Sequence, residues 1–89
     1  MPKRVDANQR QIVRHLRAVP GVSVAHTHTI GQGFPDIVVG FRGNSYLVEI
    51  KTDNGTLTPD EERWHARWTG QVAIARSSEE ILRLIGALE

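Results

Sequence analysis

The sequence contains no cysteine, which excludes a disulfide framework, a thiolate zinc site and a cysteine nucleophile. It also lacks any apolar run near the ~20 residues that a membrane span needs, and its N-terminus lacks the apolar core of a signal peptide. It has no low-complexity stretch, internal repeat or acidic tail. These absences predict a soluble, intracellular protein, and they fit the cytoplasm.

The chain is short and carries little net charge. Its 89 residues are enough for one domain, residues 1–89, because chains of this size bury only about 60–65% of their unfolded surface. Self-association would bury more surface and add to so small a core. The net charge of +1 and the pI of about 8.3 are too weak to indicate nucleic-acid binding by themselves.

The chain begins with a helical pattern. Apolar residues at helical spacing predict a helix from about Ala7 to Ala18. Asp6 is the expected N-cap, with Gln9 as its capping-box partner. Pro20-Gly21 ends this helix, because proline and glycine together interrupt helical backbone.

Three strands are predicted next. Residues 22–30 alternate with the period of two that is typical of a strand. Residues 37–41 form a short apolar run, residues 42–45 predict a turn, and residues 46–51 resume the strand pattern. The second and third strands are therefore expected to pair as a hairpin.

The second half of the chain predicts a helix, a strand and a last helix. Thr58-Pro59 and Glu61 supply an N-cap, a first-turn proline and a capping-box acid for a helix that ends near Gly70. Residues 72–75 predict a short buried strand, and Ser77 caps the last helix. The order α-β-β-β-α-β-α predicts an α/β fold in which a mixed sheet is flanked by helices.

The hairpin turn determines which charged residues share a face. A loop centred between Gly43 and Asn44 places Asp36 opposite Lys51 and diagonal to Glu49. Side chains alternate between faces, so these charges share one face and the apolar residues share the other. The backbone positions of the two acids are then roughly 5 to 8 Å apart, and their carboxylates can converge on one cation.

This arrangement suits metal-dependent phosphodiester hydrolysis. Mg²⁺ prefers hard oxygen ligands and usually takes one or two carboxylates, here those of Asp36 and Glu49. The adjacent ammonium of Lys51 can orient an attacking water, help it lose its proton and stabilise the charge that builds on the phosphate. The three residues are the predicted catalytic set.

Several motifs together resemble the VRR-NUC branch of the PD-(D/E)xK nuclease superfamily, from the first helix to Ser77. They are Gly33-Phe34-Pro35-Asp36-Ile37-Val38-Val39, Val48-Glu49-Ile50-Lys51, and Leu57-Thr58-Pro59 ahead of a helix that bears Trp64. The resemblance implies a restriction-endonuclease-like α/β core that binds Mg²⁺ or Mn²⁺ through Asp36, Glu49 and the backbone carbonyl of Ile50. It also implies a homodimer that cuts branched DNA such as Holliday junctions.

Two positions depart from the family pattern. The family often has an acidic residue in the first helix, where this chain has Gln9, and it favours glutamine early in the second helix, where this chain has Glu61. Helix capping alone accounts for both residues, so they are possible supporting residues and not members of the catalytic set.

Other functional assignments remain open. A solvated hairpin face also accounts for the charged triplet taken alone, and a catalytically inactive DNA-binding or assembly module is the main alternative function. A hydrolase acting on RNA or on a small phosphoester is a third. His26 and His28 are expected on one strand face, more often a polar surface than a metal site. Trp64 and Trp68, one helical turn apart, are expected to contact the core or a partner subunit.

Overall fold

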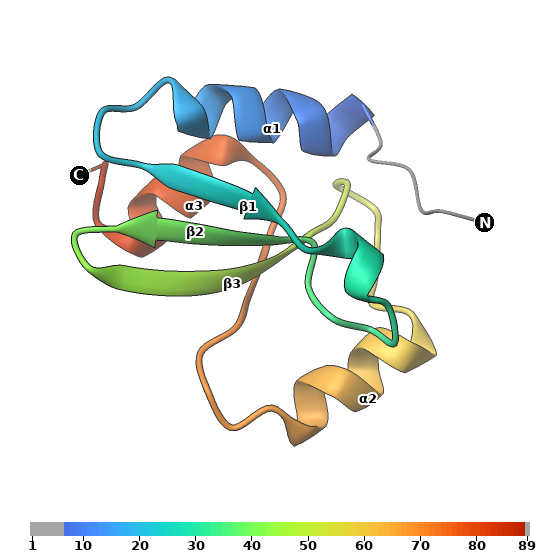
Figure 1. Ribbon diagram of the computed structural model, residues 1–89. Coiled ribbons are helices and arrows are strands. Elements are labelled where there is room, and N and C mark those ends of the chain that lie inside the picture. The colour runs from blue at the N-terminus through green and yellow to red at the C-terminus, as the bar shows by residue number, and fades with distance from the viewer. Residues whose placement is uncertain (1–6, 89) are drawn as a thin grey trace.

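A four-stranded sheet forms the centre of the structure, a computed structural model that describes residues 7–88 (Figure 1). Its strands are β1 (Ser23–His26), β2 (Ile37–Phe41), β3 (Asn44–Ile50) and β4 (Ala73–Ala75), and they lie in that order across the sheet. The pairs β1–β2 and β2–β3 are antiparallel, whereas β4 is parallel to β3. The predicted mixed sheet is confirmed.

Three α-helices and one short 3-10 helix surround the sheet: α1 (Ala7–Arg17), η1 (His28–Ile30), α2 (Pro59–Arg67) and α3 (Ser78–Ile85). Helix α1 packs against α3 and β1, and α3 also packs against β4. Helix α2 lies apart from α1 and α3, near the end of the sheet where β2 begins (Figure 1). The order α-β-β-β-α-β-α is as predicted, with η1 added. Among the described residues, none of the helices has the length and apolar character needed to cross a membrane.

The core forms where α1 and α3 cover one face of the sheet. Leu16 of α1 and Ile81 of α3 are fully buried, as are Ile37, Val39 and Val48 of the sheet. The sheet residues are two apart within each strand, so they all point to the same face. The alternation in the sequence therefore predicted correctly which face of the hairpin is buried.

The pairing of the hairpin differs from the prediction by two residues. Its loop consists of Arg42 and Gly43, which both have positive φ (52° and 83°), as a two-residue type I′ turn requires. Phe41 therefore pairs with Asn44, not with Tyr46. The prediction placed the turn at the Gly-Asn pair because both residues tolerate positive φ, but here an arginine takes that conformation. A shift of two residues leaves every side chain on its predicted face.

Strand β1 is shorter than the predicted strand over residues 22–30. It ends at His26, and His28 begins η1 instead of continuing the strand. Continuing the register places Asp36 opposite Thr27 and Pro35 opposite His28, and Pro35 has no N–H with which to extend the ladder. The Thr27 hydroxyl donates instead to the Pro35 carbonyl at 2.7 Å, and the Thr27 N–H donates to the Asp36 carbonyl at 2.8 Å.

The helix boundaries largely follow the predicted caps. Thr58 and Glu61 form the predicted capping box of α2, and the Ser77 hydroxyl accepts from the Glu80 N–H at 3.1 Å. Helix α2 ends at Arg67, before Gly70, because Trp68 is already extended. The predicted N-cap of α1, Asp6, lies outside the described residues.

The tryptophans of α2 are not part of the core, contrary to one of the predictions for them. None of the residues of α2 is buried, and 42% of Trp68 is exposed. Trp64 and Trp68 stack on each other with ring centroids 4.7 Å apart, and Phe34 packs edge-on against Trp64 at 5.2 Å. This aromatic group sits beside the sheet because α2 does not join α1 and α3 on the buried face.

We expect Leu16→Ala to lower the free energy of unfolding by about 2–5 kcal/mol, because it leaves a cavity in the only layer that joins α1 to the sheet. Urea unfolding measures the loss. The matched control is Leu84→Ala on α3, where 44% of the side chain is exposed and a change within about 0.5 kcal/mol is expected. Equal losses in the two variants would contradict this description of the core.

Candidate active site

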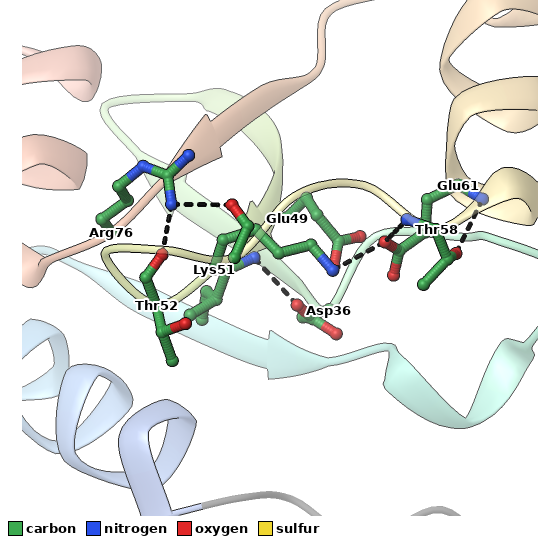
Figure 2. A network of polar contacts seen from close by, with 9 residues as sticks. Asp36, Glu49, Lys51, Thr52, Thr58, Glu61 and Arg76 are labelled. Atoms are coloured by element: carbon green, nitrogen blue, oxygen red, sulfur yellow. Dashed lines mark hydrogen bonds and ion pairs between the residues drawn. The ribbon is translucent and has the colours of Figure 1, made fainter.

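A cleft of about 350 Å³ opens where the start of β2, the end of β3 and the N-terminus of α2 meet. It is lined by all six residues predicted for the site or its support: Gln9, Asp36, Glu49, Ile50, Lys51 and Glu61. They come from α1, the β2–β3 hairpin and α2, so the fold brings together residues up to 52 positions apart (from 9 to 61). Figure 2 shows the polar contacts among the residues at its floor.

Asp36 and Glu49 face each other across the hairpin. Continuing the observed register one residue beyond Ile37–Val48 places Asp36 opposite Glu49, so the predicted pairing of Asp36 with Lys51 is wrong. Asp36 is held by the strand edge: its N–H donates to the Val48 carbonyl at 3.1 Å, and its Oδ2 accepts from the Ile50 N–H at 2.8 Å. The corrected register brings the two acids closer than the diagonal arrangement would.

Glu49 is a buried acid with an unusual pKa. Only 1% of the residue is exposed, and burial raises the pKa of its carboxyl to about 9, helped by a hydrogen bond and charge repulsion from Asp36. The negative charge of Glu61 raises the pKa of Glu49 further, and the positive charge of Lys51 offsets only part of this increase. Within residues 7–88 its Oε1 atom has no hydrogen-bond partner. A buried carboxyl oxygen without a donor is suited to a cation.

Lys51 points into the cleft and is held there by Glu61. Its Nζ lies 2.6 Å from Glu61 Oε1 and 3.6 Å from Glu49 Oε2 (Figure 2). Burial lowers the pKa of Lys51, but the hydrogen bond to Glu61 and the charge of Glu49 outweigh burial and raise it overall. For Glu61, burial raises the pKa, while the hydrogen bonds from Lys51 and from the Thr58 backbone together lower it. Lys51 is therefore a fixed positive charge.

Glu61 has two structural functions, of which the sequence indicated one. The same Oε1 that binds Lys51 accepts from the Thr58 N–H at 2.8 Å, and the Thr58 hydroxyl accepts from the Glu61 N–H at 3.2 Å. The capping box predicted from the sequence thus also orients the acid toward Lys51. The start of α2 and Lys51, which directly follows β3, are linked through this one carboxylate.

Gln9 and His28 form another wall of the cleft, and both contact His26. Gln9 is 4% exposed, and its Nε2 lies 3.0 Å from His26 Nδ1. The rings of His26 and His28 meet edge to face at 5.7 Å, although His28 belongs to η1 and not to the predicted strand. Burial lowers the pKa of His26, and the charges of Arg17 and His28 lower it further. Gln9 thus contacts His26, which capping alone did not indicate.

Two further residues shape the site. Gly33 has a φ of +84°, and a Cβ there would lie 2.4 Å from the Asp60 carbonyl oxygen, so only glycine allows this loop to approach α2. Arg76 donates to the Thr52 carbonyl and, at 3.0 Å, to the Gly55 carbonyl, which anchors the loop after Lys51 (Figure 2). The sequence held no signal for the Arg76 contacts, which join segments 21 to 24 residues apart.

The oxygens at the floor of the cleft fit a hard divalent cation. Within the described part of the chain, no group of three or more His, Cys, Asp or Glu side chains is placed to hold a metal ion. A set of two carboxylates and one backbone carbonyl is nevertheless what Mg²⁺ usually takes from a protein, with water and substrate oxygens as its other ligands. Asp36, Glu49 and the Ile50 carbonyl make up such a set, and Glu49 Oε1 has no hydrogen-bond partner among residues 7–88.

We expect Glu49→Gln to stabilise the metal-free protein at pH 8 but not at pH 4. Because the folded-state pKa of about 9 exceeds the ordinary value of 4.5, the stability linked to this proton is complete below pH 4.5 and is lost as the pH rises toward 9. Glutamine mimics the protonated acid at every pH. Thermal unfolding in a chelator should therefore give the variant a melting temperature higher by at least about 4 °C at pH 8. A constant difference from pH 4 to pH 9 would show that Glu49 titrates normally.

Comparison with known proteins identifies the fold. A solved structure described as a VRR_NUC domain is similar to this chain, with 27% sequence identity and a TM-score of 0.66. The similarity covers 88% of this chain and 89% of that chain. No family model matches the sequence, and the curated proteins give no match. The resemblance predicted from the motifs around Asp36 and Glu49 is confirmed at the level of the fold, and the chain is an α/β domain with the VRR-NUC nuclease fold.

Proposed function

We propose that this domain is a metal-dependent endonuclease that hydrolyses DNA phosphodiester bonds. The observation that carries the proposal is the pair of carboxyl groups of Asp36 and Glu49, which lie together in the cleft beside the fixed ammonium of Lys51. Serine or cysteine chemistry requires no such arrangement. The nuclease fold supplies independent support.

Mg²⁺ or Mn²⁺ is the proposed cofactor, held by the carboxylates of Asp36 and Glu49 and by the carbonyl of Ile50. The hydrogen bond from the Ile50 N–H to Asp36 Oδ2 fixes that carboxylate against the strand, beside the carboxyl group of Glu49. A bound cation would supply Lewis-acid polarisation of the scissile phosphate and activation of the attacking water. Its charge would also allow Glu49 to ionise at neutral pH, since the repulsion from Asp36 would be offset.

Lys51 acts as an electrostatic residue in this proposal. Its raised pKa keeps it protonated at neutral pH, so it donates hydrogen bonds and does not accept a proton. Its ammonium can orient a water or a phosphate oxygen and stabilise the negative charge that develops as the phosphorus gains a fifth oxygen. Glu61 fixes the position of Lys51, so little reorganisation is needed when substrate binds.

Branched DNA such as a Holliday junction is the proposed substrate, and a homodimer is the proposed active form. The family resemblance supports both, and a two-fold protein matches a junction that needs paired cuts. Exposed apolar residues support self-association, because Ile74 on β4 is 44% exposed and Trp68, which follows α2, is 42% exposed. A small domain gains stability by covering such residues.

We expect Glu49→Ala and Lys51→Ala each to lower DNA cleavage by at least about 100-fold, because they remove charge stabilisation of the transition state. Both should retain DNA binding, since they do not remove phosphate contacts outside the cleft. The assay uses linear, flapped, four-way and single-stranded DNA, and RNA, with Mg²⁺, Mn²⁺ or chelator. Glu62→Ala, one residue from Glu61 but exposed, is the matched control and should cut normally. Undiminished cleavage by Lys51→Ala would contradict the proposal that Lys51 stabilises the transition state.

Mg²⁺ or Mn²⁺ should also raise the melting temperature of the wild-type protein, by an amount that grows with concentration. Glu49→Ala should abolish this increase, whereas Glu62→Ala should preserve it. This readout does not depend on activity. An increase that survives in Glu49→Ala would place the metal elsewhere.

A catalytically inactive DNA-binding or assembly module is the second candidate, and Gln9 is the observation that favours it. The family often has an acid in this helix, but Gln9 is buried in the cleft wall with its amide against His26. DNA binding without cleavage under all metal conditions would support this candidate. Gain of cleavage in Gln9→Glu would identify the missing acid as the cause. Cleavage of RNA alone would instead support the ribonuclease alternative.

We expect light scattering at micromolar concentration to give twice the chain mass of 9.9 kDa. Ile74→Glu should shift the protein toward the single-chain mass, because burying a carboxylate in an apolar interface is costly. Leu84→Glu on α3, with the same 44% exposure but on the opposite layer, is the control and should leave the mass unchanged. A wild-type mass of one chain would rule out the dimer.

A further inference from the structure

A second hollow of about 410 Å³ lies between α1 and β1. Its lining consists of Arg10, Val13, Arg14, Arg17 and His26, and we call it the arginine groove. Val13 is 2% exposed and forms its floor, while the arginines lie along one side of α1 at positions i, i+4 and i+7. Arg17 is fixed by a hydrogen bond from its Nη2 to the Val24 carbonyl at 2.9 Å. Within the part of the chain that the structure describes, the lining contains no acidic residue.

The charge of this region is much more positive than that of the chain. Residues 7–35 include three arginines and no aspartate or glutamate, although the whole chain has a net charge of only +1. Apart from Asp6, the acids that balance the total begin at Asp36, and several of them lie in the cleft, on α2 and on α3. The low net charge of the chain therefore does not reflect the local charge of α1, β1 and η1, which together form a basic surface.

The arginine groove adjoins the candidate active site. Gln9 lines the cleft and His26 lines the groove, and their side chains are in contact at 3.0 Å. His28, which also lines the cleft, packs edge to face against His26 at 5.7 Å. A ligand that extends beyond the cleft in this direction passes directly from Asp36 and Lys51 to the arginines.

From this geometry we infer that the arginine groove binds the sugar-phosphate backbone of duplex DNA on one flank of the scissile phosphate. The inference rests on the proposed nuclease function and adds the path of the substrate to it. Positions 10 to 17 span ~10 Å of helix at ~1.5 Å per residue, which is comparable to about three base-pair steps of ~3.4 Å along the axis of a DNA duplex. Guanidinium groups suit phosphate oxygens because they donate parallel hydrogen bonds.

Such contacts are independent of base sequence and remote from the bond that is cut. They should therefore determine how tightly DNA binds and how steeply binding falls with salt, and not the rate of the chemical step. This separates the groove from Lys51, whose loss should lower the cleavage rate and leave most of the affinity.

The test is the double variant Arg10→Gln/Arg14→Gln, in which Arg17 keeps its contact with Val24. Fluorescence anisotropy with a labelled duplex and a labelled four-way junction, in chelator, gives Kd between about 50 and 200 mM salt. We expect Kd to rise at least about tenfold and the salt slope to fall by about two, near 0.9 for each lost phosphate contact. In the metal-dependent assay KM should rise while kcat at saturating DNA stays within about twofold.

Two further variants make the result specific. Arg42→Gln/Arg83→Gln removes the same charge from the hairpin turn and from α3, and it should change Kd by less than about threefold. Arg10→Lys/Arg14→Lys keeps the charge and should keep the salt slope. Equal weakening by the two glutamine double variants, or wild-type affinity in Arg10→Gln/Arg14→Gln, would overturn the groove as the binding site.

The absence of cysteine allows the path of the DNA to be mapped directly. Gln11→Cys places a single thiol on the exposed surface of α1, where a tethered iron chelate can cleave nearby DNA by hydroxyl radicals. We expect cuts on one flank of the enzymatic cleavage site and none from the same probe at Arg83→Cys. Cuts on both flanks alike, or none, would contradict the path.

These experiments separate the groove from the function on which it rests. If the wild type cleaves DNA with metal and Arg10→Gln/Arg14→Gln binds DNA with wild-type affinity, the groove is not the binding site but the nuclease function stands. If the wild type binds no DNA, both proposals are wrong. Strong, groove-dependent binding without cleavage keeps the groove and favours the inactive module.

Discussion

The carboxyl group of Glu49 is buried against that of Asp36, and the rest of the site is arranged around the repulsion between them. Two like charges at this separation cannot both ionise in a poorly hydrated cleft unless a cation joins them. Lys51 offsets only part of the negative charge because its ammonium is already shared with Glu61. Three acids and one base therefore face one another, and the site is completed either by a proton, as the high pKa of Glu49 indicates, or by a divalent cation.

The backbone forces this unfavourable pair together. The two-residue turn at Arg42-Gly43 sets a register in which position 36 faces position 49, so a different loop length would separate the acids. The approach of α2 depends on Gly33, where any side chain would collide with the Asp60 carbonyl. The stability of the core that α1 and α3 form with the sheet offsets the cost of burying Glu49. Strain of this kind is typical of functional sites.

Much of this arrangement was predictable from local patterns, and the failures have physical causes. The period of two in the hairpin was enough to place Asp36, Glu49 and Lys51 on one face, because a register error of two residues does not change faces. The exact partners depended on whether Arg42 or Asn44 adopts positive φ, which propensity alone does not decide. The contacts of Gln9 with His26 and of Arg76 with the loop after Lys51 join distant segments, and only the folded chain shows them.

The two departures from the family pattern are best understood together. The family often has an acid in the first helix and glutamine in the second, and this chain has Gln9 and Glu61, both of which line the cleft. The exchange keeps one acid and one amide but moves the negative charge from the α1 wall to the neighbourhood of Lys51. An acid beside Lys51 raises its pKa and fixes it, which makes it a permanent positive charge and unsuited to act as a base. Because Gln9 is neutral, the α1 side of the cleft has no negative charge among residues 7–88, next to His26, His28 and the arginine groove. The same exchange therefore favours an electrostatic role for Lys51 and an approach of the DNA backbone along α1.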